Sequence, residues 1–304
     1  MKFQILIPTD FSVLSKAAVK YAMKLSLSIP SHIELLHIVE SFPLTATRKE
    51  SYFQRRITLA KKDAKELREE LEKDGFPSNF TLHVVHGNPF HQALLEYVKS
   101  KNTDLIVMGT RGGDARKKQL LGSHVTSAME HCPCPVLTVP VDSPFHSIQH
   151  LVYATDLTEI HQEMYVLTAF AQYFDAYIHV LHIFPEKLTW NLFDAEKISR
   201  DLSIEHQYKK ISFYALMEDD VLSGIEQYLK DKPIDLLAQF THQRNFFQRF
   251  VEYSVSKESI IHNSLPIITF KKIFQEGFQL SYPEMNFPLK KSAINKKLKN
   301  KHQD

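Results

Sequence analysis

The chain has 304 residues, of which 43% are hydrophobic and 24% charged, and its formal net charge is +2 at pH 7. This composition is that of an ordinary globular protein, and the length fits two domains. The small net charge excludes a general electrostatic attraction to nucleic acid or to acidic membranes. The two cysteines, Cys132 and Cys134, stand too close together for a disulfide framework.

Targeting and membrane signals are not found in the sequence. Its apolar runs all fall short of the ~18 residues that a membrane span needs. The first residues lack the apolar region and the cleavage site of a signal peptide. We therefore expect a cytoplasmic protein without a membrane partner.

Short apolar strands alternate with helices through the first half of the chain. The helix after the first strand follows Asp10 and Ser12, two residue types that cap helices. Strands are expected at 3–8, 33–39, 81–85, 104–108 and 135–139, and helices at 14–25, 48–73, 89–99 and 123–131. This alternation predicts a parallel sheet, and strands that are apolar almost throughout predict helices on both faces. The first half is therefore expected to be a doubly wound α/β domain.

The same pattern then begins again. "ILIPTDFS" at 5–12 returns as "LVYATDLT" at 151–158, and "IELLHIV" at 33–39 returns as "IHVLHIF" at 178–184. Residues 1–143 and 147–273 are therefore predicted to be two copies of one fold, each with a five-stranded parallel sheet. Their last strands, "PVLTV" and "PIITF", are expected to pair and form an internal pseudo-dimer, because they would otherwise be exposed edges. Residues 274–304 form a basic tail whose role the sequence leaves open.

Four of the eight glycines lie in the stretch "GTRGGDARKKQLLGS" at 109–123. It leads from a strand into a helix, where free backbone N–H groups and the helix dipole suit phosphate. Glycines there allow close backbone approach and positive φ, and Ser123 is expected at the N-cap. A Walker A loop is excluded because no lysine stands between Gly122 and Ser123. A flexible surface loop remains the alternative.

The expected position of this stretch favours a ligand site. In a doubly wound sheet, ligands bind at the carboxyl ends of the strands where the strand order reverses. Strands one and four are usually neighbours at that point, which would place Asp10 beside the glycine-rich stretch. Its carboxylate could then hold a ribose or a base edge.

The spacing Gly109-x2-Gly112-x9-Gly122-Ser123, with "ILIPTDFS", "LLHIV", "DLIVMGTRG" and "HCPCPVLTV" around it, resembles the universal stress protein family. The resemblance covers the first half fully and the second more weakly, so the whole is similar to a tandem member. It implies two Rossmann-like domains, of the adenine nucleotide alpha hydrolase-like kind, that bind ATP or AMP; we expect Mg²⁺ to help neutralise the phosphates. The residues carried over by match are Pro8, Thr9 and Asp10 on the adenosine side, Ile38 at the base, Met108 and Gly109 at the ribose, and Gly112, Gly122, Ser123 and the His124 backbone at the phosphates. His124 stands where the family commonly has a small aliphatic residue.

The leading hypothesis is a nucleotide-dependent regulator of the stress response. The sequence nominates no catalytic residue and no metal ligand, which favours a binding protein over an enzyme. The alternatives are a nucleotide-independent scaffold or partner-binding protein, and a slow ATPase or nucleotide-activating transferase on the same fold. A homodimer of chains and an unknown protein partner stay open. The second half is expected to have lost nucleotide binding, because Phe240, Gln243 and Tyr253 align with Gly109, Gly112 and Gly122, and only Ser254 preserves Ser123.

Overall fold

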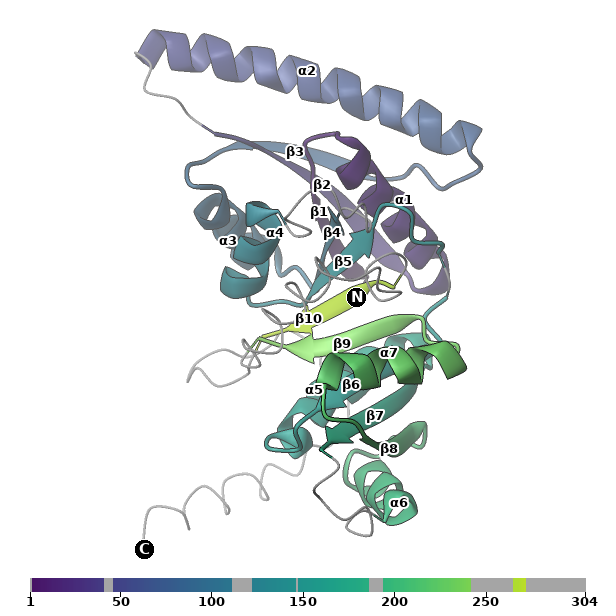
Figure 1. Ribbon diagram of the computed structural model, residues 1–304. Coiled ribbons are helices and arrows are strands. Elements are labelled where there is room, and N and C mark those ends of the chain that lie inside the picture. Colours follow the sequence, from purple (N-terminus) through teal and green to yellow (C-terminus); the bar gives the residue numbers. More distant parts are fainter. Residues whose placement is uncertain are drawn as a thin grey trace, which may run out of the picture.

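A computed structural model describes residues 2–40, 46–110, 122–145, 147–185, 194–241 and 265–271. Within these residues, ten strands form one sheet in the order β3-β2-β1-β4-β5-β10-β9-β6-β7-β8 (Figure 1). The expected α/β fold is confirmed. No helix in these ranges is long and apolar enough to cross a membrane.

The first half of the chain supplies strands β1 to β5, which are all parallel. Its elements are β1 Phe3–Pro8, α1 Val13–Ser28, β2 Ser31–Val39, α2 Ala46–Lys73, β3 Thr81–His86, α3 Phe90–Lys101, β4 Leu105–Thr110, α4 Ser123–His131 and β5 Val136–Pro140. The order and type of these elements are those expected from the sequence, with ends displaced by one or two residues in most cases.

The second half repeats this arrangement with strands β6 to β10. Its elements are β6 His150–Thr155, α5 Ile160–Phe174, β7 Tyr177–Phe184, α6 Ala195–Glu205, β8 Ile211–Met217, α7 Val221–Asp231, β9 Leu236–Phe240 and β10 Ile267–Phe270. The strand order β8-β7-β6-β9-β10 mirrors β3-β2-β1-β4-β5, as two copies of one fold require.

The two halves meet at their last strands. β10 pairs with β5 in antiparallel register, with Ile267 opposite Thr138, and the Thr138 hydroxyl donates to the carbonyl of Ile267 at 3.2 Å. The predicted pairing of these two strands is therefore confirmed. It removes the open edges that β5 and β10 would otherwise present, while β3 and β8 remain at the two ends of the sheet.

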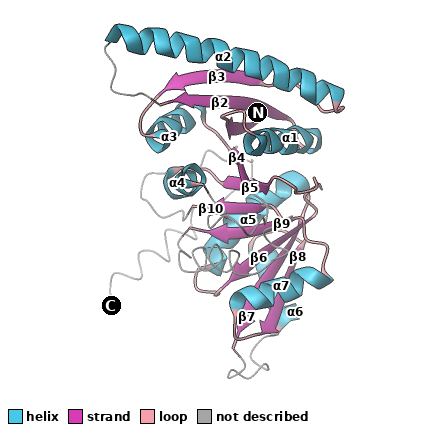
Figure 2. Ribbon diagram, turned by 45° about the horizontal axis from the view of Figure 1, so that its top comes forward, coloured by secondary structure: helices cyan, strands magenta, loops and turns pink. Residues whose placement is uncertain are grey.

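The two faces of the sheet are packed differently. On one face, a single apolar cluster runs through both halves and includes Ile7, Ala18, Leu67, Tyr153 and Leu167, so α1, α2 and α5 lie on that face. On the other face each half has a separate cluster, beneath α3 and α4 in the first half and beneath α7 in the second. Figure 2 shows α3 and α4 on the side of the sheet opposite α1. The halves are thus joined by one strand pair and by a continuous core on one face.

Candidate functional site

The candidate site lies at the carboxyl ends of β2, β1 and β4. β1 pairs with β4 on one side and with β2 on the other, so the strand order reverses at β1 as expected. Pro8 ends β1 opposite Leu36, and Thr9 continues the contact because its N–H donates to the Leu36 carbonyl at 2.9 Å. Asp10 is therefore placed beside the end of β4, where a doubly wound sheet binds ligands.

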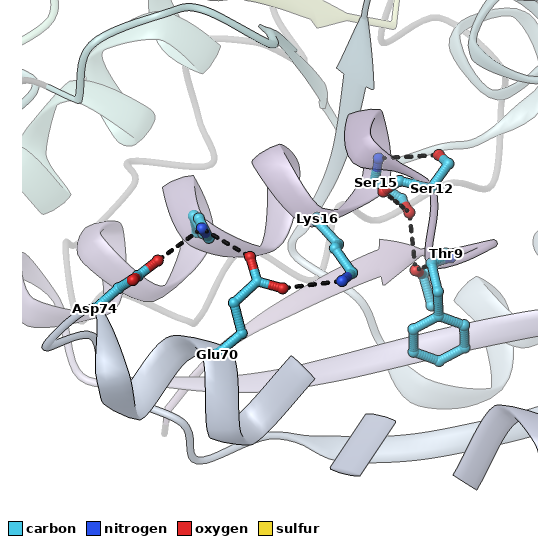
Figure 3. A network of polar contacts seen from close by, with 8 residues as sticks. Thr9, Ser12, Ser15, Lys16, Glu70 and Asp74 are labelled. Carbon is cyan, nitrogen blue, oxygen red and sulfur yellow. Dashed lines mark hydrogen bonds and ion pairs between the residues drawn. The ribbon is translucent and has the colours of Figure 1, made fainter. Parts of the chain in front are cut away.

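A compact polar turn connects β1 to α1 (Figure 3). The Asp10 carboxylate accepts hydrogen bonds from the Ser12 N–H at 3.0 Å and the Ser15 hydroxyl at 2.9 Å. The Thr9 hydroxyl contacts Ser15 Oγ at 3.1 Å and accepts from the Phe11 N–H at 3.0 Å. Ser12 is the N-cap of α1 and accepts from the Ser15 N–H. Part of the acceptor capacity of Asp10 is thus used to shape the protein's own turn.

The charge on Asp10 is favoured by this turn. Partial burial by itself would raise the pKa of the carboxyl, but the hydrogen bonds from Ser12 and Ser15 outweigh it and lower the pKa below its ordinary value. Asp10 is exposed, whereas Thr9 is buried. Asp10 therefore presents an ionised carboxylate to solvent at the end of β1.

The turn is repeated in the second half, where "TDFS" at 9–12 returns as "TDLT" at 155–158. Phe11 has a φ of 60° and Leu157, its counterpart, has a φ of 69°, a conformation uncommon for residues other than glycine. His37 donates from Nδ1 to the Thr9 carbonyl at 2.8 Å, and His182 donates in the same way to the Thr155 carbonyl at 2.9 Å. The alignment of "IELLHIV" with "IHVLHIF" places His37 and His182 at the same position of the two copies, as this shared contact requires. The Thr-Asp pair is therefore a structural device in both halves, whatever else it does in the first.

Gly109 lies inside β4, opposite Val139, and does not follow the strand as expected. β4 extends to Thr110 because β5 continues alongside it as far as Pro140. A Cβ at Gly109 would stand 1.9 Å from the carbonyl oxygen of Leu14, in the first turn of α1. The glycine is thus required by the close packing of α1 on β4. Met108, its neighbour, is buried in the cluster beneath α3 and α4.

The beginning of α4 has no side-chain cap among the described residues. Gly122 is the N-cap, with φ −68° and ψ 154°. The prediction of Ser123 as the N-cap is wrong, because the helix begins at Ser123 itself. Among the described residues, the first N–H group of α4 with a hydrogen-bond partner is that of Thr126, which donates to the Gly122 carbonyl at 3.1 Å. The N–H groups of Ser123, His124 and Val125 stand in the positions that α-helix geometry leaves unpaired.

Gly122 differs from Gly109 in what surrounds it. A Cβ built on Gly122 would have no atom of the described residues within 4 Å. Its φ is negative, and so is not the positive φ that was expected to explain these glycines. Gly112 and four basic residues lie outside the described residues: Arg111, Arg116, Lys117 and Lys118. Neither local strain nor packing among the described residues requires a glycine at position 122.

His124 is directed away from the helix axis toward β2 and α3. Its ring stacks on Phe90 with centroids 4.0 Å apart, and Nε2 lies 3.9 Å from a carboxylate oxygen of Glu40. Gly122, Ser123 and His124 are all exposed. The backbone of His124 is thus available at the helix start while its ring is held against a neighbour. Ile38, near the end of β2, is half-buried beside the same cluster as Met108.

Only the first of the three glycine positions can be compared in the second half, and it is occupied there by a phenylalanine. Phe240, at the Gly109 position, is buried, with its ring 5.6 Å from that of Tyr153 and stacked 5.4 Å from that of Phe270. A ring in this place excludes the close helix–strand contact that Gly109 allows. Gln243, Tyr253 and Ser254 lie outside the described residues. Ala154, at the Pro8 position, is buried, and Asp156 accepts from the Thr158 N–H at 3.0 Å, as Asp10 does from Ser12.

Comparisons with known proteins agree with this architecture. The model of the universal stress protein family matches residues 1–140. A universal stress protein of Thermus aquaticus is 30% identical over 136 residues, which cover 44% of this chain and 96% of that protein. A second, from Methanocaldococcus jannaschii, is 28% identical over 138 residues, which cover 45% of this chain and 81% of that protein. The chain therefore belongs to the universal stress protein family.

One solved structure extends the likeness in fold to both halves. A universal stress protein from Archaeoglobus fulgidus superposes with a TM-score of 0.64 at 17% identity, covering 88% of this chain and 98% of its own. At this identity the likeness concerns the fold. It supports the description of the chain as an α/β protein with a large, mostly parallel sheet flanked by helices.

Proposed function

We propose that the first half of the chain binds an adenine nucleotide, ATP or AMP, with its phosphates at the beginning of α4. The observation that carries this proposal is the N-terminus of α4, which no described side chain caps and which lies near the carboxyl end of β2, where His124 Nε2 is 3.9 Å from Glu40. Unpaired N–H groups and the positive end of a helix dipole bind phosphate without any charged side chain. We also propose that residues 1–143 form the nucleotide-binding domain and that residues 147–273 form a second, degenerate domain.

Gly122 supports it because the described part of the protein gives no other reason for a glycine there. Gly109 is accounted for by the Leu14 carbonyl at 1.9 Å from its Cβ position, whereas no atom of the described residues lies within 4 Å of a Cβ built on Gly122. A phosphate group approaching the helix start would occupy that open space. A side chain at position 122 would then meet the ligand, although it meets no described part of the protein.

The remaining residues are assigned by their place around this point. Pro8, Thr9 and Asp10 would line the adenosine side, with the ionised Asp10 carboxylate facing the ribose or the base edge. Ile38 would contact the base through its backbone, and Met108 and Gly109 would lie beside the ribose. Gly112, Ser123 and the His124 backbone would surround the phosphates, with Mg²⁺ neutralising part of their charge. In this function the chain acts as a nucleotide-dependent regulator in the cytoplasm.

A matched pair of substitutions tests the proposal. Aspartate and asparagine are both good N-cap residues of almost equal size, so Gly122→Asp and Gly122→Asn should leave α4 equally stable. Only the aspartate brings a negative charge to the phosphate position. Titration calorimetry of the full chain with ATP and with AMP, with and without Mg²⁺, should show binding abolished in the aspartate variant and retained, though weakened, in the asparagine variant.

The same measurement separates the proposal from a nucleotide-independent scaffold. A wild-type chain that binds neither ATP nor AMP, and that carries no nucleotide by mass spectrometry after purification, would contradict nucleotide binding. Equal affinity in the two Gly122 variants would show that the nucleotide binds somewhere other than the start of α4.

A further inference from the structure

Three metal-ligating side chains come together in the second half, away from the α4 site. His161 lies in the first turn of α5, Glu205 is the last residue of α6, and His206 follows it. One ligand atom from each lies within 4.8 Å of the others. His161 Nδ1 and a Glu205 carboxylate oxygen are 2.7 Å apart. Sequence spacing does not predict this cluster, because 44 residues separate His161 from Glu205.

His206 is the unusual member of the cluster. Its side chain is only 7% exposed, and neither ring nitrogen has a hydrogen-bond partner among the described residues. Buried polar atoms without a partner destabilise a fold, and they are uncommon in native proteins. Tyr165, one helical turn after His161, places its ring edge-on to His206 with centroids 4.5 Å apart. This contact packs the imidazole ring but leaves its nitrogens without a partner.

We propose that His161, Glu205 and His206 form a binding site for a divalent transition metal of the zinc class. Two imidazoles and one carboxylate are a donor set that Zn²⁺ takes in proteins. Metal–ligand distances of ~2.0–2.1 Å place the ligands of a tetrahedral ion about 3.3 Å apart. The spacings of 2.7 Å to 4.8 Å bracket this value, so small side-chain rotations bring the three atoms to one ion.

The surroundings of the cluster favour a cation that remains accessible from solvent. His206 is the C-cap of α6 and so stands at the negative end of the helix dipole. The side chains of His161 and Glu205 are 64% and 39% exposed, which leaves an entry path and a fourth position for water. The bound ion satisfies a nitrogen of His206 and links the start of α5 to the end of α6. Its role is to fasten these two helices together on the second half.

The test uses the untagged, full-length chain, stripped of metal with a chelator and titrated with Zn²⁺ by calorimetry and with Co²⁺ by visible absorption. Glu205→Gln and His161→Gln change exposed ligands, so these variants keep the fold. His131→Gln is the control, because His131 is an exposed histidine outside the cluster that contacts the Ser127 carbonyl at 2.8 Å. Mg²⁺ serves as the hard-cation comparison.

We expect one Zn²⁺ per wild-type chain, with affinity weakened at least about tenfold in each ligand variant and unchanged in His131→Gln. Co²⁺ should give the intense visible bands of a four- or five-coordinate ion in wild type only, and Zn²⁺ should raise the unfolding midpoint of wild type but not of Glu205→Gln. Mg²⁺ should not compete. Zinc affinity that is the same in wild type and both ligand variants, or the absence of stoichiometric binding by wild type, would overturn the proposal.

Discussion

At the scale of single residues, the two glycines of the motif that the structure describes serve different purposes. Gly109 lets α1 pack against β4, whereas a Cβ at Gly122 would meet no atom of the described residues within 4 Å. The sequence alone could not separate these two roles, because spacing shows that a glycine is present but not which neighbour approaches it. The glycine motif therefore contains both a packing residue, Gly109, and a candidate ligand contact, Gly122.

This difference predicts that the same small substitution destabilises the chain more at Gly109 than at Gly122. Gly109→Ala forces a methyl group onto the Leu14 carbonyl and should destabilise the chain by about 1–3 kcal/mol or more, because a packed core tolerates added volume poorly. Gly122→Ala should cost only about 0.5–1 kcal/mol, because it meets no described atom but replaces glycine by alanine, a poorer residue at the N-cap of α4. Chemical denaturation without nucleotide measures both. Equal stability of the two variants would show that Gly109 is not held by this contact.

His179 predicts how stability depends on pH. Its ring is buried on β7, contacts the Tyr228 hydroxyl at 2.7 Å through Nδ1 and lies 3.0 Å from the His150 ring through Nε2. Burial first, and then the nearness of His150 and Lys232, lowers the pKa of His179 from 6.5 to about 4. The folded chain therefore binds this proton less readily than the unfolded chain does.

It follows that the contribution of neutral His179 is fully present above pH 6.5 and is lost as the pH falls toward 4. The loss over this window is on the order of 3 kcal/mol, since one pKa unit corresponds to about 1.4 kcal/mol. His179→Gln removes the titrating group, so its stability should fall less than that of wild type between pH 7 and pH 4. Denaturation midpoints that shift in parallel for both proteins would contradict this assignment.

At the scale of elements, sequence periodicity predicted the kinds of element well and their ends less well. The alternation of strands and helices predicted the order of β1 to β5. The prediction was clearest for β1, β4 and β5, which are buried almost throughout and read as apolar runs. The end of β4 was missed because continuation through Gly109 and Thr110 depends on β5 lying alongside. The N-cap of α4 at Gly122 differs by one residue from the expected N-cap at Ser123.

The pairing of β5 with β10 predicts that the two halves depend on each other. Ile268 on β10 is fully buried and lies opposite Leu137 on β5. An aspartate at position 268 would bury an unpaired charge in this pairing, which is strongly destabilising. Ile268→Asp should therefore lower the stability of both halves in one transition, as followed by circular dichroism and by proteolysis at sites in the first half.

Expression of the halves as separate chains provides the complementary measurement. Residues 1–143 and 144–273 should associate when mixed, because each alone leaves β5 or β10 as an exposed apolar edge. Wild-type association and its loss in the Ile268→Asp form of the second fragment would both be read by analytical ultracentrifugation. Two stable, soluble monomers with no affinity for each other would contradict the interdependence.

At the scale of the whole molecule, the repeat has kept the architecture and changed the sites. Both halves retain the polar turn with its histidine donor, through His37 in the first and His182 in the second. At the end of the fourth strand they diverge, because Gly109 is replaced by the buried ring of Phe240. The cluster of His161, Glu205 and His206 belongs to the second half only, since Ser15, at the position of His161, is part of the α1 cap. One half is thus proposed to bind nucleotide, and the other to bind metal.

This asymmetry predicts at most one nucleotide per chain. Phe240 is packed between Tyr153 and Phe270, so that position offers no open backbone. Gln243 and Tyr253 stand where the motif has its other two glycines, and an Asp156 carboxylate without an anion-binding backbone beside it would repel phosphate. Phe240→Gly alone should therefore leave the stoichiometry unchanged while destabilising the chain by about 3–5 kcal/mol through the cavity it creates. Equilibrium dialysis with radiolabelled ATP measures the number of sites. Two equivalent sites in wild type, or binding that survives Gly122→Asp at half the stoichiometry, would show that the second half has kept a nucleotide site of its own.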